Sequence, residues 1–583
     1  MQRALNDLGV WRWWLGALFC VPVVFPYRFL PIPNFFQGVI AFGLVALAAF
    51  AIALARLRSR DHTVGITLVA WIPLLLAALL AVQQLFGMLS YLQHFLLPFG
   101  ALLLAAMAAN VAYHRLAKEI NVALTVIAIA VVVAGVINAG FGVFQLAGYE
   151  IKGFNLEERA PGPFRVAGLI AQPNQLAVLV IWSMLGLLYL WLQKRLSTAF
   201  SMLLLCIFML TLAFAASRAT YIYLILIGPA LALGLHRVRA RCWWLPVAVA
   251  VAYALLDVLV RTLLPIADPA AASEIVRPLD GASAAVRVGF IRDGWQLFLS
   301  SPILGVGWHQ FIVARWSLST ATPLELHADH SHNIVINMLA ETGVFGFAIV
   351  FVGVALWAWR AFSVSVTLER LVAVAMLGVV GLYSLFEFPL WYAHFLLPVA
   401  VLFGLLETRQ SSFVITPSFA WLRTAAAGAL VGVIGVVAYD YNRVESVYRV
   451  YFGPATEERP NLESVLELTN TTLFREEAEQ VFLLAAPIDA FNASFSGKMS
   501  ERVFSGFPAP QFAVVHAAHV LYSGDEAHAA YILERTCQWQ PSSCAVMRAR
   551  FEELAETNGE PFSSFAVNRL KKSLPGAAAP ASP

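Results

Sequence analysis

The chain has 583 residues, of which 60% are hydrophobic and only 13% are charged, whereas soluble proteins carry about 25% charged residues. This composition excludes an ordinary soluble globular protein. The net charge is +3 and no basic tract is long enough to follow a phosphate backbone, so nucleic acid is not an expected partner.

Apolar runs recur as far as residue 440, and most approach the length of about 20 residues that a helix needs to cross a bilayer. The alternation that marks a transmembrane β-barrel is missing, so the spans are expected to be helices. No cleavage site follows the first run, and we expect it to remain as the first helix. The fold class predicted is an all-α polytopic membrane protein of about 13 transmembrane helices. The runs cover residues 10–26, 36–55, 63–86, 95–112, 120–147, 168–193, 197–216, 219–235, 243–265, 334–358, 371–388, 392–407 and 421–439.

Basic residues close every second run, and short basic loops remain in the cytoplasm. These residues are Arg56, Arg58, Arg60, Arg115, Lys118, Lys194, Arg195, Arg237, Arg239, Arg241, Arg360 and Arg409. We therefore expect a cytoplasmic N-terminus and a C-terminus on the outer side. Residues 1–440 would form the transmembrane domain, with a large outer loop at 265–333.

Several basic residues break this rule because they fall in outer segments: Lys152, Arg159, Arg165, Arg218, Arg277, Arg287, Arg292 and Arg315. Guanidinium groups suit phosphate, so an anionic ligand is one interpretation. The alternative for Arg218 is snorkelling from a helix end. Arg287 and Arg292 lie on residues 282–299, which have the pattern of an amphipathic helix with Val288, Ile291 and Trp295 on one face.

Three imidazoles and a carboxylate occupy six residues of the outer loop, His327, Asp329, His330 and His332, just before Asn333 and a long apolar run. Ionisable groups at a membrane boundary are costly unless they are used. His332 could act as a general base. The alternative is a simple helix start capped by Asn333 or Ser331, and a second alternative is a metal site on these four side chains.

Two further features complete the pattern. Gln172 and Asn174 open the sixth run beside Arg165, and their amides could contact sugar hydroxyls or phosphate instead of merely starting a helix.

The stretch after Asp440 loses its long apolar runs, so residues 441–583 are expected to form a separate soluble helical domain. Within it, residues 509–557 have the pattern of a helix-turn-helix repeat around Gly524, Cys537 and Cys544 could form a disulfide, and residues 575–583 have a disordered composition.

Several of these motifs together resemble the bacterial O-antigen ligase superfamily, and within it the pilin-type and general protein O-oligosaccharyltransferases. The motifs are Gln172-Pro173-Asn174, Ser217-Arg218-Ala219-Thr220, Arg287 ahead of Ser301-Pro302-Ile303-Leu304-Gly305-Val306-Gly307, and His330-Ser331-His332-Asn333 running into Glu341-Thr342-Gly343. The likeness covers most of residues 1–410. One departure is Ile291, where the family often has tryptophan.

The resemblance implies a metal-independent glycosyltransferase of the inner membrane, without cofactor. It would move an oligosaccharide from undecaprenyl pyrophosphate to Ser or Thr of a pilin or other periplasmic protein, with inversion at the anomeric carbon. By position, His332 is the essential base and Arg218 and Arg287 bind pyrophosphate, with Gln172, Asn174, Arg165, Arg292, His330 and Asn333 as supporting residues. The active site and the C-terminal domain would be periplasmic.

Two other functions remain open at this point. The first is a lipopolysaccharide O-antigen ligase or O-antigen polymerase, which shares the chemistry but uses another acceptor. The second is a transporter of the lipid-linked glycan, which would use the arginines only for binding. A transporter is expected to have repeated halves and ionisable sites at the midplane, and the sequence has no evident repeat.

Overall fold

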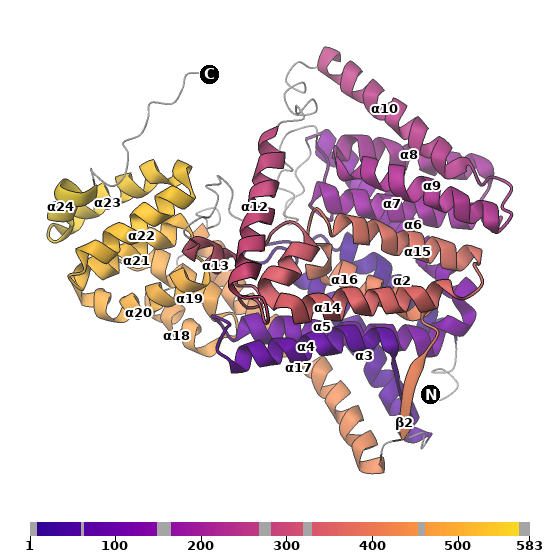
Figure 1. Ribbon diagram of the computed structural model, residues 1–583, viewed down its shortest axis with the longest axis horizontal. Coiled ribbons are helices and arrows are strands. Elements are labelled where there is room, and N and C mark those ends of the chain that lie inside the picture. The colour runs from indigo at the N-terminus through magenta and orange to yellow at the C-terminus, as the bar shows by residue number, and fades with distance from the viewer. Residues whose placement is uncertain are drawn as a thin grey trace. The chain divides into compact units, whose positions relative to one another are not determined.

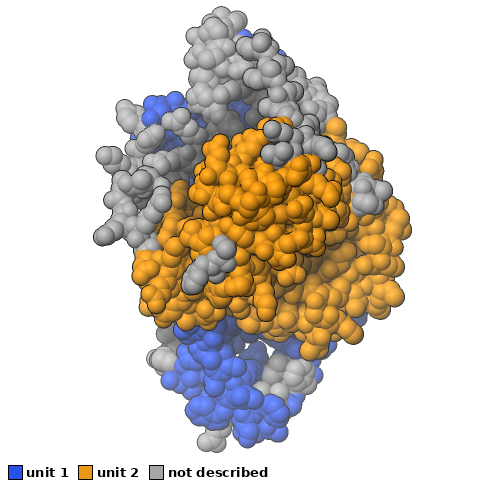
Figure 2. All heavy atoms as spheres, turned by 90° about the vertical axis from the view of Figure 1, so that its left-hand side faces the viewer, with its two compact units in different colours: residues 1–77, 100–280, 349–436 blue, residues 78–99, 281–348, 437–583 orange. Residues whose placement is uncertain are grey.

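The computed structural model describes residues 8–59, 63–148, 165–267, 281–318, 329–414, 416–452 and 461–570, and helices dominate them (Figure 1). The chain folds into two compact units (Figure 2). Unit 1 comprises Met1–Ala77, Gly100–Asp280 and Ile349–Val436, and unit 2 comprises Ala78–Phe99, Gly281–Ala348 and Val437–Pro583. Each unit is thus built from segments that are far apart in the sequence.

The elements of unit 1 are α2 (Leu8–Val24), α3 (Phe35–Arg58), β1 (Thr63–Thr67), α6 (Ile120–Leu146), α7 (Pro173–Leu192), α8 (Thr198–Ala215), α9 (Ala219–Arg237), α10 (Leu245–Ala267), α15 (Leu368–Tyr383), α16 (Ala393–Leu406) and β2 (Gln410–Val414). Four helices run from one unit into the other: α4 (Trp71–Leu85), α5 (Gln93–Leu116), α14 (Ile334–Phe362) and α17 (Pro417–Phe452). Unit 2 adds α12 (Gly281–Ser300), α13 (Phe311–Ser317), α18 (Leu462–Thr471), α19 (Arg475–Ala485), α20 (Ala490–Gly506), α21 (Pro510–Tyr522), α22 (Glu526–Trp539), α23 (Cys544–Asn558) and α24 (Phe562–Phe565).

Helix α7 is the centre of unit 1. It is apolar all round and almost wholly buried, as expected of a helix that packs on every side. It lies beside α6, α8 and α15 (Figure 1). Gly135 and Gly186 allow α6 and α7 to approach closely, because an added Cβ would come within 2.3 Å of Ser183 Oγ or 2.9 Å of Val131 Cγ2. Small residues at such crossings are typical of membrane helices.

Within the described residues, nine helical stretches are long and apolar enough to cross a membrane, and α5 and α6 together count as one of them. Two shorter apolar helices, Gly9–Val24 and Ala393–Leu406, accompany them. A multi-pass helical membrane protein is therefore confirmed. The number of 13 spans, the outer loop at 265–333 and the domain boundary at residue 440 stay predictions.

The expected span at residues 63–86 is wrong at its start. Thr63–Thr67 forms strand β1, which pairs antiparallel with β2, and Gly65 lies opposite Ser412. The helix begins only after this strand because the edge of β2 supplies the backbone partners that a helix would otherwise provide. Other ends also differ: residues 168–172 form a turn before Pro173, and the last apolar helix continues past residue 439 to Phe452.

In unit 1, several basic helix ends gather near the β1–β2 ladder. Arg360 donates to Glu407 Oε2 at 3.3 Å, and Arg370 donates to the carbonyls of Ala361 and Leu406 at 2.9 and 3.2 Å. The Glu407 carboxylate also accepts the backbone N–H of Val69 at 3.0 Å. Arg360 and Arg370 therefore lie close together around Glu407. This arrangement is compatible with basic loops on one side of unit 1.

The C-terminal helices α18 to α24 share one hydrophobic core in unit 2. The expected helix-turn-helix is confirmed: α21 ends at Tyr522, Gly524 turns the chain with a φ of 86°, and Asp525 caps α22 by accepting His528 N–H at 2.9 Å. The structure joins Cys537 to Cys544 by a disulfide. The Ala- and Pro-rich stretch 575–583 lies outside the described residues.

Candidate functional site

The loop that contains His330 and His332, called the histidine loop below, ends in a tight turn at the start of α14. Asn333 Oδ1 accepts the N–H groups of Val335 and Ile336 at 3.0 and 3.1 Å, so Asn333 caps the helix. Ser331 N–H donates to Asn337 Oδ1 at 3.0 Å, and Ser331 Oγ donates to the Asn333 carbonyl at 2.9 Å. Between them, His332 has a φ of 53°, which is uncommon outside glycine. These hydrogen bonds of its neighbours hold the backbone turn that carries His332.

The two imidazoles of this loop are neighbours. The ring centroids of His330 and His332 are 4.3 Å apart, and the ring of Phe290 lies 5.6 Å from that of His332. The Asp329 carboxylate hydrogen-bonds Nδ1 of His330. A half-buried imidazole beside a second imidazole and a carboxylate is a reasonable general base. His327, the remaining residue of the metal alternative, lies outside the described residues.

A second turn, Ser301–Gly307, presses against α14 at Glu341-Thr342-Gly343. Val306 N–H donates to the Ala340 carbonyl at 2.8 Å, and Gly307 N–H to the Glu341 carbonyl at 3.2 Å. Gly305 and Gly343 have φ values of 72° and 62°, and a Cβ on either would meet backbone atoms at 2.3 or 2.2 Å. Only glycine fits at these two positions. The segment Gly305-Val306-Gly307 is thus a tight turn.

Two buried residues fix this turn: Glu341, which belongs to the Glu341-Thr342-Gly343 motif, and Gln83, which was not singled out from the sequence. Gln83 donates to the carbonyls of Leu304 and Glu341, both at 2.7 Å, and accepts the N–H of Trp308 at 3.1 Å. The Glu341 carboxylate accepts the N–H of Phe311 at 3.3 Å and is 1% exposed. The only signal for Gln83 was an amide inside an apolar run.

Helix α12 carries Arg287 and Arg292, and the prediction of a helix over 282–299 is confirmed. Val288, Trp295 and Leu299 on its apolar face are exposed at 64%, 46% and 61%, as on a surface that meets lipid. The opposite face is buried in unit 2. There an added Cβ at Gly294 would come within 2.6 Å of Ile336 and 3.5 Å of Ser331, so α12 lies directly against the histidine loop.

The predicted amides cluster in unit 1. Asn174 Oδ1 accepts the hydroxyl of Ser217 at 2.9 Å, and Asn174 Nδ2 lies 3.4 Å from Glu387 Oε1. Gln172 caps α7 by accepting Gln175 N–H at 2.5 Å, so the prediction of a cap at this position is confirmed. Glu387 was not predicted, because it lies at the end of the apolar run 371–388 without any motif of its own.

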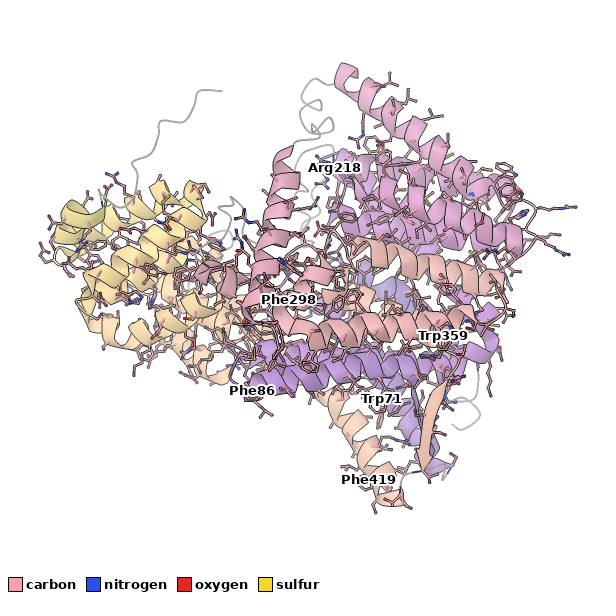
Figure 3. The ribbon with its side chains drawn as sticks, viewed as in Figure 1. Trp71, Phe86, Arg218, Phe298, Trp359 and Phe419 are labelled. Carbon is pink, nitrogen blue, oxygen red and sulfur yellow. A yellow bond between two sulfur atoms is a disulfide. The ribbon has the colours of Figure 1, made fainter. Side chains whose placement is uncertain are left out.

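Arg165 and Arg218 belong to the same region of unit 1. Arg165 Nε donates to the Ala215 carbonyl at 3.1 Å, and Ala215 ends α8. Ala216 then turns the chain with a φ of 48°. Arg218 is exposed at the N-terminal end of α9 (Figure 3). The structure thus brings together Arg165, Gln172, Asn174 and Arg218 in unit 1, and His330, His332, Asn333, Arg287 and Arg292 lie in unit 2. A shared reaction centre for Arg218 and His332 stays a prediction.

Two protein families match the chain. Residues 166–351 match the family described as O-antigen ligase, and this region contains the histidine loop, Arg218, Arg287 and Arg292. Residues 371–543 match the family described as the C-terminal part of a virulence factor membrane-bound polymerase. The two matches together cover more than half of the chain.

The chain is also similar to a general O-oligosaccharyltransferase from Acinetobacter baylyi. The two sequences are 24% identical over 276 residues, which are 44% of this chain and 47% of the relative. The matched region therefore spans about half of the relative's length.

Proposed function

Because the chain belongs to the O-antigen ligase superfamily, we propose that it is a protein O-oligosaccharyltransferase. It transfers an oligosaccharide en bloc from undecaprenyl pyrophosphate to Ser or Thr hydroxyls of a pilin or another periplasmic protein. The family match and the name of the Acinetobacter relative support glycan transfer onto protein. The observation that carries the assignment is the half-buried imidazole of His332, which lies beside His330 on a turn that hydrogen bonds of Ser331 stabilise.

The proposed reaction is a single displacement. The acceptor oxygen forms a bond to the anomeric carbon as its proton passes to the imidazole of His332, and the bond from that carbon to the phosphate oxygen breaks. The pair of electrons leaves with the pyrophosphate, where Arg218 and Arg287 stabilise the added charge. Attack from the side opposite the leaving group inverts the anomeric carbon. The side chains named here supply the proton acceptor and the cations, and the proposal needs no cofactor or metal.

The topology of this proposal follows from the basic loops. Cations at the ends of alternate spans would remain in the cytoplasm, which leaves the histidine loop and the C-terminal domain in the periplasm of a bacterial inner membrane. A disulfide such as Cys537–Cys544 is typical of an oxidising compartment. The helical C-terminal domain would bind the protein acceptor.

The test uses purified full-length protein, lipid-linked oligosaccharide and a pilin peptide. Replacing the general base in His332→Ala is expected to lower the rate of glycopeptide formation by about 10²- to 10⁴-fold. His236→Ala is the matched control, because His236 is an exposed imidazole at the end of α9 and its loss should leave the rate unchanged. Equal product from the wild type and His332→Ala would refute the assignment.

The second candidate is an O-antigen ligase or polymerase, which the polymerase family matched at residues 371–543 favours. Its acceptor would be lipid A core or a second lipid-linked glycan. The same assay separates the candidates when these acceptors replace the peptide. Product with lipid A core or with glycan, and none with peptide, would assign the second function.

A further inference from the structure

One cation of the outer loop is completely buried in unit 2. The guanidinium of Arg315 on α13 pairs with Asp293 on α12 at 2.8 Å, and both side chains are 0% exposed. The guanidinium also lies between two aromatic rings, with its carbon 5.1 Å from the centroid of Phe290 and 5.2 Å from that of Trp539. A buried ion pair is weak evidence for stability, because desolvation offsets much of the attraction. A role other than stabilising the fold is therefore considered for the buried Arg315–Asp293 pair.

Through Trp539, the buried Arg315 contacts the C-terminal domain. Trp539 is the last residue of α22 and is 2% exposed. It lies between Cys537 and Cys544, so the disulfide closes the turn that carries it. Arg535 Nε donates to the Trp316 carbonyl at 3.0 Å, and Trp316 Nε1 donates to Thr536 Oγ1 at 3.3 Å. Helix α13 is thus fixed against α22 at Trp316, the residue next to Arg315.

On the other side, the arrangement reaches His332. Phe290 is 1% exposed, and its ring lies between the guanidinium of Arg315 and the imidazole of His332. Gly294, one helical turn further along α12, lies against Ser331 and Ile336. A shift of α12 would therefore displace the imidazole that the proposed function uses, and the same helix carries Arg287.

We propose that Arg315 is a positioning residue, which links Trp539 of the disulfide-closed turn to His332 through Phe290. This inference rests on the proposed role of His332. Arg315 does not touch the reacting atoms. Its guanidinium is a flat group that can stack on two rings and pair with a carboxylate at once, and a lysine ammonium cannot reproduce this combination. The C-terminal domain thereby influences the position of His332 through Trp539, although none of its own residues lies in the proposed reaction centre.

The experiment measures glycopeptide formation and the midpoint of thermal unfolding for variants of the full-length protein. Trp539→Leu, Phe290→Leu and Arg315→Lys are each expected to lower kcat by about 10- to 100-fold, since a small misplacement of a catalytic group has this effect. Trp539→Phe keeps a ring over the guanidinium and should retain the rate within about twofold. Arg502→Lys is the matched control, because Arg502 also pairs with a buried carboxylate, that of Glu479 at 2.5 Å.

The decisive measurement is a double-mutant cycle. Trp539 and Phe290 both contact Arg315, so their leucine variants should be non-additive, with the double variant at least about fivefold faster than the product of the single effects. Arg502→Lys combined with Phe290→Leu should be additive. Additive effects of Trp539→Leu and Phe290→Leu, or kcat losses in Arg502→Lys as large as in Arg315→Lys, would overturn the inference.

Two controls separate this outcome from other failures. If His332→Ala retains full activity, the proposed function itself is wrong, whereas loss of activity in His332→Ala with additive cycle variants overturns only the role of Arg315. Should a leucine variant not fold, Arg315→Lys and Trp539→Phe decide the question. If Arg315→Lys retains its kcat, the proposal is contradicted. If kcat falls in Arg315→Lys while the midpoint of thermal unfolding is unchanged, the proposal is supported.

Discussion

The imidazole of His332 depends on a backbone turn that its own sequence position does not reveal. Its left-handed φ of 53° is held by Ser331 and by Asn337, which lies one turn into α14. Asn337 is fully buried within an apolar run, and a buried amide is costly unless it is hydrogen-bonded. The residues that orient the candidate base are thus polar exceptions in apolar helices, as Gln83 and Glu341 also are.

Glu476 on α19 is another such residue. It is 7% exposed, and its carboxylate lies 2.6 Å from Nε2 of His94. Burial raises the pKa of Glu476 from 4.5 to about 7, with His309 opposing and Glu479 assisting the rise. The folded state therefore favours the protonated carboxyl, which can donate its hydrogen to the imidazole. Its contribution to stability is complete below pH 4.5 and is lost as the pH rises toward about 7.

The prediction for this residue is a pH-dependent midpoint of thermal unfolding. Between pH 5 and pH 8 the wild type is expected to lose stability, and Glu476→Gln is expected to lose less, because its amide stays neutral and still donates to His94. Glu501→Gln on the exposed face of α20 is the control and should follow the wild type. Parallel curves for Glu476→Gln and the wild type would contradict the prediction.

At the scale of elements, α12 shows how much depends on one helix. Its 20 residues place Phe290 and Asp293 in the core of unit 2 and leave Val288 and Leu299 exposed. The amphipathic pattern was evident in the sequence, but pattern alone does not say which side meets the protein and which meets lipid. The small residue Gly294 decides this, because it permits contact with the histidine loop.

The corresponding prediction is that Gly294→Ala reduces both stability and transfer activity. Alanine in a helix interior is ordinarily about 1 kcal/mol more favourable than glycine, but here its Cβ would come within 2.6 Å of Ile336. Gly140→Ala in α6 is the matched control, since a Cβ there meets nothing within 4 Å, and it should be neutral or stabilising. Unfolding midpoints and initial rates of the two variants give the comparison. An unchanged midpoint and rate for Gly294→Ala would show that α12 has room to move.

At the scale of the whole molecule, each unit is assembled from distant parts of the chain. In unit 2, Tyr91 donates to Glu479 at 3.0 Å and Gln93 donates to Glu477 at 2.9 Å, so the segment before α5 is fixed on α19. Contacts of such sequence separation follow from three-dimensional packing and leave no local motif. The C-terminal domain is consequently part of the same compact unit as the histidine loop.

The prediction at this scale concerns the disulfide. Replacing both Cys537 and Cys544 by serine opens a loop of sequence separation 7 and is expected to cost about 2–3 kcal/mol of stability, because the unfolded chain regains freedom. The unfolding midpoint should fall by several degrees and become insensitive to reductant. Cys206→Ser, which changes a free exposed cysteine, is the control. A double variant as stable as the wild type would show that the bond contributes nothing to unit 2.

The sequence by itself determined the class of fold and the location of the candidate chemistry. Long apolar runs can be satisfied only by membrane helices, and His332, Arg218 and Arg287 were recognisable because ionisable groups stand out in apolar surroundings. The helix-turn-helix around Gly524 was also predictable, since glycine marks local turns.

Only the tertiary structure decided the support around those residues. Strand β1 forms at the start of an expected span because it pairs with β2. The sequence did not reveal this pairing, because β2 lies more than 300 residues away. Gln83 and Glu387 acquire their roles from partners in distant segments, and Arg315 pairs with a residue of another helix. Local pattern records which face of a helix is apolar, whereas the identity of its neighbour is a property of packing, and packing is fixed only when the whole unit has assembled.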